Sequence, residues 1–237
     1  MRTKWFAVFA VASVWFASYT YAASLSPLQR DAIYEAYFST FHNALRNLHS
    51  YDKSSVDGTK GYEMYTPVGQ YFDVAGFAPY DSEDDAQLHA WYCHSDAIVF
   101  ATNVSSQSYF GGNEGTIFTD STFVVDEVIK GQPGAIRAGF PADVVRIGGT
   151  VEDGADTLKV MVANRPDFEK GKEYFLLLNK PNQPVFQAWH TSDWVTVEVA
   201  ADRFHPSMKS PFGIMPGESP EALRSRIDWL AHRFACH

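Results

Sequence analysis

Hydrophobic and polar positions change their spacing several times along this chain. Between residues 27 and 49 the apolar side chains recur at steps of three and four, the spacing of one face of an amphipathic α-helix. Residues 51–61 are polar and contain two Gly-ending pairs, which predicts a loop. Residues 62–90 mix aromatic side chains with Gly and Pro, and we expect irregular structure there.

From residue 91 onward the pattern becomes that of strands. Segments rich in β-branched and aromatic residues follow at short spacing, each bounded by Gly, Pro, Asn or Asp. They are residues 96–102, 117–129, 144–147, 158–162, 173–178, 184–189 and 194–199. The first two, separated by Gly111-Gly112-Asn113, predict a long hairpin. The series predicts a mainly β fold, either a meander or a small barrel, and leaves no room for βαβ units.

The C-terminal end returns to helical spacing. Ser219-Pro220-Glu221 is a strong helix start, and four apolar residues after it fall on one face. They are Leu223, Ile227, Leu230 and Phe234. We therefore expect a short helix that docks on the β domain.

The N-terminus has the order of a secretory signal peptide. Two basic residues, Arg2 and Lys4, precede an uncharged stretch from Trp5 to Tyr19, and small residues follow at Ala22-Ala23-Ser24. The apolar stretch is shorter than the ~20 residues that a membrane-spanning helix needs. We expect a signal peptide over 1–22, cleavage after Ala22, and a secreted or periplasmic protein that has no membrane association afterwards.

Composition and charge narrow the classes of partner. The chain has 237 residues, 46% of them hydrophobic and 20% charged, which is a globular composition. Its 19 basic and 28 acidic side chains give a formal net charge of −9. Removal of Arg2 and Lys4 with the signal peptide leaves 17 basic and 28 acidic side chains, a net charge of −11. Nucleic acids and anionic membranes require a positive surface, so we expect neither as a partner.

Four segments, in order, resemble the tissue inhibitors of metalloproteinases and the netrin-like modules. Tyr92-Cys93-His94-Ser95-Asp96-Ala97-Ile98-Val99-Phe100-Ala101 resembles their first barrel strand, and Phe123-Val124-Val125-Asp126-Glu127-Val128-Ile129-Lys130-Gly131 their long strand ending in Lys-Gly. Residues 168–176 are similar to their Glu-Tyr/Phe-Leu strand, and residues 221–236 to a short helix followed by Cys. The resemblance implies an OB-like closed β-barrel over 91–237, with the C-terminal helix packed on it and residues 23–90 as a helical and irregular extension.

The two cysteines, Cys93 and Cys236, are the clearest candidate site. An exported chain with an even cysteine count most simply carries a disulfide, and the resemblance implies a Cys93–Cys236 bridge from the first strand to the last helix. A Cys₂His₂ zinc site is the alternative. Its histidines would come from His89, His94, His232 and His237. The short paired Cys-x-x-Cys spacing is missing, so we expect no metal and no other cofactor.

The resemblance implies a function in binding rather than in catalysis. The inhibitors chelate a protease zinc with an N-terminal Cys-x-Cys, whereas residues 79–83 of this chain read Pro-Tyr-Asp-Ser-Glu. We therefore expect a secreted or periplasmic module that acts by protein–protein contact, without that chelating wedge and without enzymatic activity. No Gly-x-Ser-x-Gly elbow is present. The alternative is a small secreted hydrolase or metal-dependent protein that uses the four histidines named above.

Other polar clusters have simpler interpretations. The acidic run 81–85 lacks the glycine and terminal Glu of a calcium loop and predicts a solvated loop. Asp126 and Glu127 fall on opposite faces of a strand, which is wrong for an acid–base pair. Asn103-Val104-Ser105 fits a glycosylation acceptor. One cluster around a turn, either barrel core or a surface for glycans or proteins, comprises Trp189, His190, Asp193 and Trp194.

Overall fold

The computed structural model describes residues 55–56, 59–64, 79–111, 116–153, 156–162, 167–180, 189–200, 203–205, 213–215 and 217–236. The expected signal peptide, the helix expected over 27–49 and His237 lie outside these residues, as do residues 184–188 of one expected strand. Within the described part of the chain, no helix is long and apolar enough to cross a membrane.

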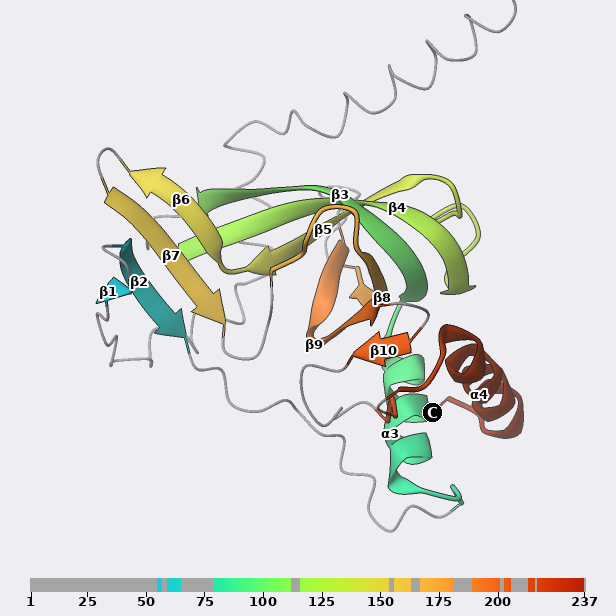
Figure 1. Cartoon of the computed structure of the whole chain (residues 1–237). Coiled ribbons are helices and arrows are strands. Elements are labelled where there is room, and N and C mark those ends of the chain that lie inside the picture. The colour runs from blue at the N-terminus through green and yellow to red at the C-terminus, as the bar shows by residue number, and fades with distance from the viewer. Residues whose placement is uncertain are drawn as a thin grey trace, which may run out of the picture.

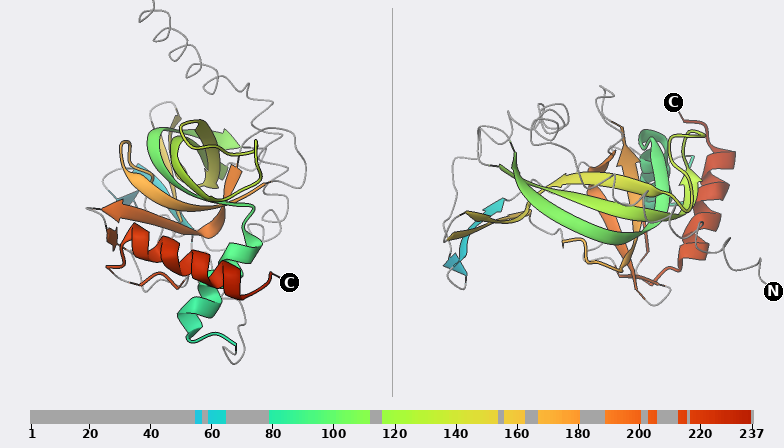
Figure 2. Two further views of the ribbon diagram at one scale, coloured as in Figure 1. Left: turned by 90° about the vertical axis from the view of Figure 1, so that its right-hand side faces the viewer. Right: turned by 90° about the horizontal axis from the view of Figure 1, so that it is seen from above.

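A curled six-stranded sheet dominates the fold and forms a half-barrel (Figures 1 and 2). Its order is β10-β9-β5-β4-β3-β8, and β9 also pairs with β8. The strands are β3 (Ala97–Gly111), β4 (Thr116–Lys130), β5 (Pro141–Ile147), β8 (Glu173–Asn179), β9 (Trp189–Ala200) and β10 (Arg203–His205). Neighbours run antiparallel except β5 and β9, which are parallel. The mainly β expectation and the long hairpin, β3 with β4, are confirmed.

A second sheet of four strands lies at the end of the molecule away from the helices (Figure 1). Its order is β1-β2-β7-β6. The strands are β1 (Ser55–Val56), β2 (Thr59–Met64), β6 (Gly149–Asp153) and β7 (Asp156–Val162). The loop expected over 51–61 is therefore wrong where β1 and β2 form. The polar β2 becomes a strand because β7, about a hundred positions later, pairs with it in parallel and satisfies its backbone.

Gly149 begins β6 at a close approach to β3. Its φ is +133°, and a Cβ added there would come within 2.2 Å of the Ser108 hydroxyl oxygen. This position therefore needs a glycine for space as well as for backbone conformation.

The C-terminal helix α4 (Pro220–Arg233) forms as its sequence indicates. The Ser219 hydroxyl accepts a hydrogen bond from the Ala222 amide, and Pro220 stands at the first helical position. The buried side chains are Leu223, Ile227 and Leu230, the spacing read from the sequence. Phe234 ends the helix as its C-cap residue.

A helix that the sequence pattern did not predict, α3 (Glu83–His94), precedes β3. The acidic run expected in a solvated loop is instead its first turn, capped by the Ser82 hydroxyl, which accepts from the Asp85 amide at 3.1 Å. Carboxylates there oppose the positive end of the helix dipole. The buried positions Ala86, Gln87, Leu88 and His89 are consecutive, so the 3.6-residue period is weak. The boundary expected between residues 90 and 91 falls inside this helix.

The pleat of β3 and β8 divides the core in two. Ile98, Phe100, Phe175 and Leu177 face α3 and α4 and form one buried cluster with them. The residues between them point to the other face and form the second cluster, inside the curl of the sheet. It comprises Ala97, Val99, Ala101, Phe123, Val125, Ile136, Ala142, Val144, Phe168, Tyr174, Leu176, Leu178 and Trp189. The helices thus cover one face and the curled sheet encloses the other.

Candidate functional site

A disulfide joins the two helical ends. Cys93, in the last turn of α3, is bonded to Cys236, which follows α4, and the two lie 143 positions apart in the sequence. This is the pairing that the resemblance implies, but Cys93 lies in α3 and not in the first strand of the barrel. The Lys130 ammonium, at the end of β4, donates to the carbonyl of Tyr92 at 2.6 Å and lies 3.4 Å from that of Cys93. Lys130 therefore satisfies the C-terminal carbonyls of α3, where a cation is favoured. Burial lowers the pKa of this lysine, and Asp96 partly opposes the shift.

His89 lies directly beside this disulfide. Its Nε2 is 3.5 Å from Cys93 Sγ, and its Nδ1 forms a 2.7 Å hydrogen bond with the Tyr80 hydroxyl. The ring is buried, with 3% of the residue exposed, and packs near Tyr92 and Phe234. Burial also raises the pKa of Tyr80, so this phenol stays neutral at pH 7. Together these residues form the disulfide cluster: Tyr80, His89, Tyr92, Cys93, Phe234 and Cys236.

The other histidines of the expected metal alternative do not join this group. Among the described residues, the group of three or more metal-ligating side chains with ligand atoms within 4.8 Å is His89, Cys93 and Cys236. His94 is exposed at the end of α3. His232 is exposed on α4, and its Nδ1 lies 2.7 Å from the Asp228 carbonyl oxygen. Of the three histidines that the structure describes, His89 lies beside the two cysteines and His94 and His232 do not, so the expected site that uses all four histidines is wrong.

The acidic run contributes to packing rather than to a calcium site. Arg226 of α4 pairs with Glu218 at 2.9 Å and with Asp85 of α3 at 3.6 Å, and it donates to the Gly213 carbonyl. All three side chains are mostly buried, with 13% of Arg226, 7% of Glu218 and 14% of Asp85 exposed. Burial raises the pKa of Glu218, while a hydrogen bond from the Met215 amide and the charge of Arg226 lower it. This network ties the two helices together.

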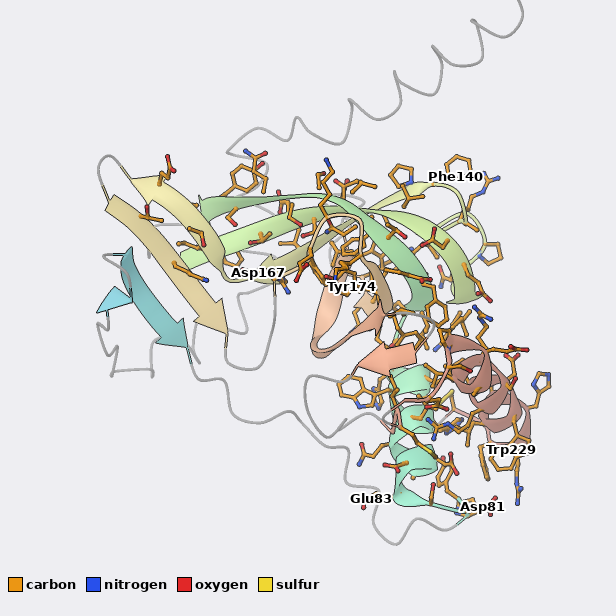
Figure 3. The ribbon with its side chains drawn as sticks, in the orientation of Figure 1. Asp81, Glu83, Phe140, Asp167, Tyr174 and Trp229 are labelled. Carbon is orange, nitrogen blue, oxygen red and sulfur yellow. A yellow bond between two sulfur atoms is a disulfide. The ribbon has the colours of Figure 1, made fainter. Side chains whose placement is uncertain are left out.

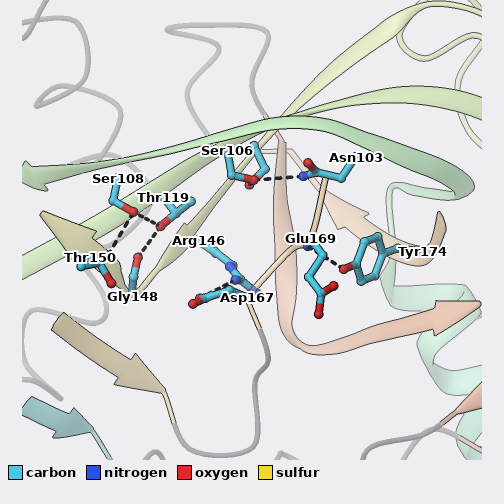
Figure 4. Close-up of polar contacts among 11 residues, drawn as sticks. Asn103, Ser106, Ser108, Thr119, Arg146, Gly148, Thr150, Asp167, Glu169 and Tyr174 are labelled. Atoms are coloured by element: carbon cyan, nitrogen blue, oxygen red, sulfur yellow. Dashed lines mark hydrogen bonds and ion pairs between the residues drawn. The ribbon is translucent and has the colours of Figure 1, made fainter. Parts of the chain in front are cut away.

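A second polar region lines the inner face of the curled sheet beyond its apolar core. The polar cluster is Asn103, Ser106, Ser108, Thr119, Ser121 and Arg146 (Figure 4). Ser106 is paired with Ser121 and Ser108 with Thr119 across the β3–β4 hairpin, with hydroxyl oxygens 2.8 and 2.9 Å apart. The Thr119 hydroxyl donates to the Gly148 carbonyl at 2.6 Å, so it accepts from Ser108. These hydroxyls satisfy one another and hold the hairpin against the turn before β6.

Arg146 closes the polar cluster from β5. Its guanidinium lies 3.0 Å from Asp167 (Figure 4). It also lies 4.1 Å from the centre of the Phe168 ring. The Tyr174 hydroxyl accepts from the Glu169 amide at 2.8 Å. Arg146 of β5 and Tyr174 of β8 therefore both hold the segment 167–169 against the sheet. Alternating Ser and Thr at 106, 108, 119 and 121 was the sequence signal for this region.

Asn103 lies inside the polar cluster. Its side chain is fully buried, and its amide nitrogen donates to Ser106 at 3.0 Å. A glycan needs a solvent-exposed amide, so the acceptor pattern at 103–105 does not mark an accessible glycosylation site in this fold. The Asn103 side-chain oxygen is buried without a hydrogen-bond partner.

Two further candidate sites from the sequence remain, the aromatic and polar cluster at 189–194 and the carboxylates of Asp126 and Glu127. Trp189 is core, with 4% of the residue exposed, so it cannot stack on a glycan, while the side chains of His190, Asp193 and Trp194 lie outside what the structure describes. Asp126 accepts from Thr102, and Glu127 lies 2.7 Å from Arg224, so each carboxylate has a partner of its own.

Two exposed aromatic side chains, Trp229 and Phe140, each lie against an arginine. Trp229 on α4 is 39% exposed, and the Arg233 guanidinium lies 4.8 Å from the centre of its ring (Figure 3). Phe140, in the segment between β4 and β5, is 51% exposed, and Arg137 lies 4.6 Å over it. Each place presents an arginine with an aromatic ring to solvent.

Comparison of the chain with protein-family models found no match, and a search of curated proteins found none either.

Proposed function

We propose that this protein is a secreted or periplasmic binding module with an OB-like closed β-barrel, which acts by contact with another exported protein. Three observations support it: the strand pairing, the disulfide between the two ends of the domain, and the exposed tryptophan on α4. The main support for binding to a protein is the exposed Trp229 ring with the Arg233 guanidinium stacked on it.

The strand pairing supports the barrel. β3 pairs with β4, β4 with β5, β5 with β9, β9 with β8, and β8 again with β3, so the pairing returns to the first strand. Five strands in this order match the partly open Greek-key barrel of the OB type. The weakest contact in the ring is β5 with β9, where only Val144 with Trp189 and Val145 with His190 are in register.

Trp229 and Arg233 support a protein partner. Tryptophan and arginine are the residue types that most often dominate the binding free energy of protein interfaces. Here they lie one helical turn apart and are already stacked, so little side-chain freedom remains to be lost on binding. The net charge of −9 disfavours nucleic acid and favours a basic or neutral protein surface.

The proposal does not include inhibition by zinc chelation. The inhibitors that the chain resembles use an N-terminal Cys-x-Cys, and both cysteines of this chain are engaged with each other. Any protease contact would therefore use a surface of the domain rather than a chelating amine and carbonyl.

Capture from the exported proteins of the host tests the proposal. Immobilised parent protein is compared with Trp229→Ala and with Asp228→Ala, which removes an exposed neighbour of Trp229 on the same helix. We expect a partner that the parent and Asp228→Ala retain equally and that Trp229→Ala binds at least about 10-fold more weakly, or about 1.4 kcal/mol. Equal capture by all three proteins, or no captured protein, would contradict the proposal.

A further inference from the structure

The disulfide cluster brings together ligand atoms of a kind that bind metal. Cys93 Sγ, Cys236 Sγ and a ring nitrogen of His89 all lie within 4.8 Å of one another. Cys93 and His89 are four positions apart on α3, so they share one face of the helix. Cys236 reaches the same point from the end of α4.

The orientation of the His89 ring fits a metal ligand. Nε2 faces the sulfur at 3.5 Å, while Nδ1 is held by the Tyr80 hydroxyl at 2.7 Å. Histidines that bind metals usually bind through one nitrogen and form a hydrogen bond through the other, which fixes the ring and the tautomer. Because a phenol can donate or accept, Tyr80 also supports the tautomer that leaves a lone pair on Nε2.

The two cysteine residues are more exposed than His89. Cys236 is exposed and Cys93 is partly exposed, which favours attack on the bridge by a dithiol reductant. His89 stays buried among Tyr80, Tyr92 and Phe234. Two-electron transfer from a dithiol breaks the sulfur–sulfur bond, leaves one proton on each cysteine, and converts the dithiol into its own disulfide.

We propose that reduction of the Cys93–Cys236 bridge converts this cluster into a zinc site, with both thiolates and His89 Nε2 as its protein ligands. The Zn²⁺ ion displaces the two thiol protons. Two thiolates and a neutral imidazole cancel its charge, which suits a site walled by aromatic rings. Three protein ligands leave a fourth tetrahedral position for water or for a ligand atom of a partner.

Thiolate and imidazole select zinc over the hard cations, since Ca²⁺ and Mg²⁺ prefer oxygen ligands. The metal also reconnects α3 with the end of α4 after the covalent bridge is lost. The two ends of the domain thus remain tied in both redox states.

Cobalt provides the test, because tetrahedral Co²⁺ bound to thiolates absorbs visible and near-ultraviolet light. The purified protein is reduced with a phosphine, freed of it, and titrated with Co²⁺ and then Zn²⁺. We expect one Co²⁺ per chain with a thiolate-to-cobalt band, displaced by one Zn²⁺, and no binding by the oxidised protein. A reduced protein that binds no Co²⁺ would overturn the proposal.

Variants identify the ligands. We expect Cys236→Ser and His89→Gln to lower the Co²⁺ affinity of the reduced protein at least 100-fold, and Tyr80→Phe about 10–100-fold, the usual loss when a hydrogen bond to a ligating histidine is removed. His232→Gln is the matched control, since this exposed histidine on α4 is outside the cluster. Unchanged affinity in His89→Gln would refute its role as a ligand.

Circular dichroism of the reduced proteins separates loss of the site from loss of the fold. If the reduced parent keeps its spectrum, the cobalt titration decides the proposal directly. If reduction unfolds the parent, one equivalent of Zn²⁺ must restore the native spectrum in the parent and in His232→Gln but not in His89→Gln. Failure of Zn²⁺ to restore the parent would overturn the proposal.

Discussion

At the residue scale, two aspartates that accept the same kind of hydrogen bond differ in the burial of their carboxyl groups. The Thr122 hydroxyl donates to Asp143, and the Thr102 hydroxyl donates to Asp126, each at 2.8 Å. Asp126 is exposed on β4, while Asp143 is half-buried on β5. Burial raises the pKa of Asp143 above its ordinary 3.8, and the bond from Thr122 opposes the shift. The two aspartates thus differ in how far packing buries the carboxyl group.

This difference predicts a pH-dependent effect of Asp143→Asn. A raised pKa means that the folded state binds the proton more tightly, so the contribution of this carboxyl to stability is complete below about pH 3.8 and is lost as the pH rises through the folded pKa. We expect Asp143→Asn, which keeps an acceptor for Thr122, to raise the free energy of unfolding at pH 7 and to lose that gain below pH 3.8.

Urea unfolding at both pH values measures the effect. Asp126→Asn is the matched control, because it changes an exposed carboxyl with an equivalent threonine partner, and it should show no such gain. An Asp143→Asn protein less stable than the parent at pH 7 would contradict the assignment of burial as the cause.

At the scale of elements, Lys130 links the end of β4 to the end of α3. It donates to the Tyr92 carbonyl and stacks over the Tyr92 ring at 4.7 Å. We expect Lys130→Met, which keeps the apolar stem, to lower the free energy of unfolding by about 1.5–3 kcal/mol, the usual worth of a charged hydrogen bond. Lys172→Met, which removes an exposed pair with Glu169, should cost less than about 1 kcal/mol. Equal losses in denaturant unfolding would argue against the helix-end role.

Arg226 links α4 to α3 and to Glu218. We expect Arg226→Met to lower the free energy of unfolding by about 3–5 kcal/mol, because it leaves the buried carboxylates of Asp85 and Glu218 without their partner. Arg224→Met on the same helix removes a partly exposed pair with Glu127 and the contact of the guanidinium with the Phe100 ring, 5.0 Å from its centre, and should cost less than Arg226→Met because it strands no buried carboxylate. Denaturant unfolding compares the two variants, and a small loss in Arg226→Met would show that the network contributes little.

At the scale of the whole molecule, the disulfide closes almost the entire domain. Its cysteines are 143 positions apart, and a loop of that length corresponds to about 4–5 kcal/mol in the chain-entropy model. We expect replacement of both Cys93 and Cys236 by serine to lower the free energy of unfolding by about 2–5 kcal/mol, the usual loss of a native bridge. Thermal and denaturant unfolding measure it, and an unchanged melting temperature would exclude a stabilising role.

Local sequence patterns were sufficient to predict those helices and strands whose own residues show a clear helix or strand pattern. The two strands of the β3–β4 hairpin are rich in β-branched and aromatic residues, and α4 has a cap, a proline and apolar side chains at helical spacing. α3 was missed because its buried positions are consecutive. β2 was missed because its backbone is satisfied by β7, and no local rule encodes a pairing over about a hundred residues.

The mainly β composition, the long hairpin, the last helix and the two cysteines of the bridge all follow from local patterns in the sequence. Which polar residues are functional candidates depends on the tertiary structure. It buried Asn103, Trp189 and His89, placed Tyr80 and the sulfurs around His89, and left Trp229 in solvent. Burial and proximity of this kind depend on how the curled sheet and the two helices pack, and residue type and spacing along the chain do not specify that packing.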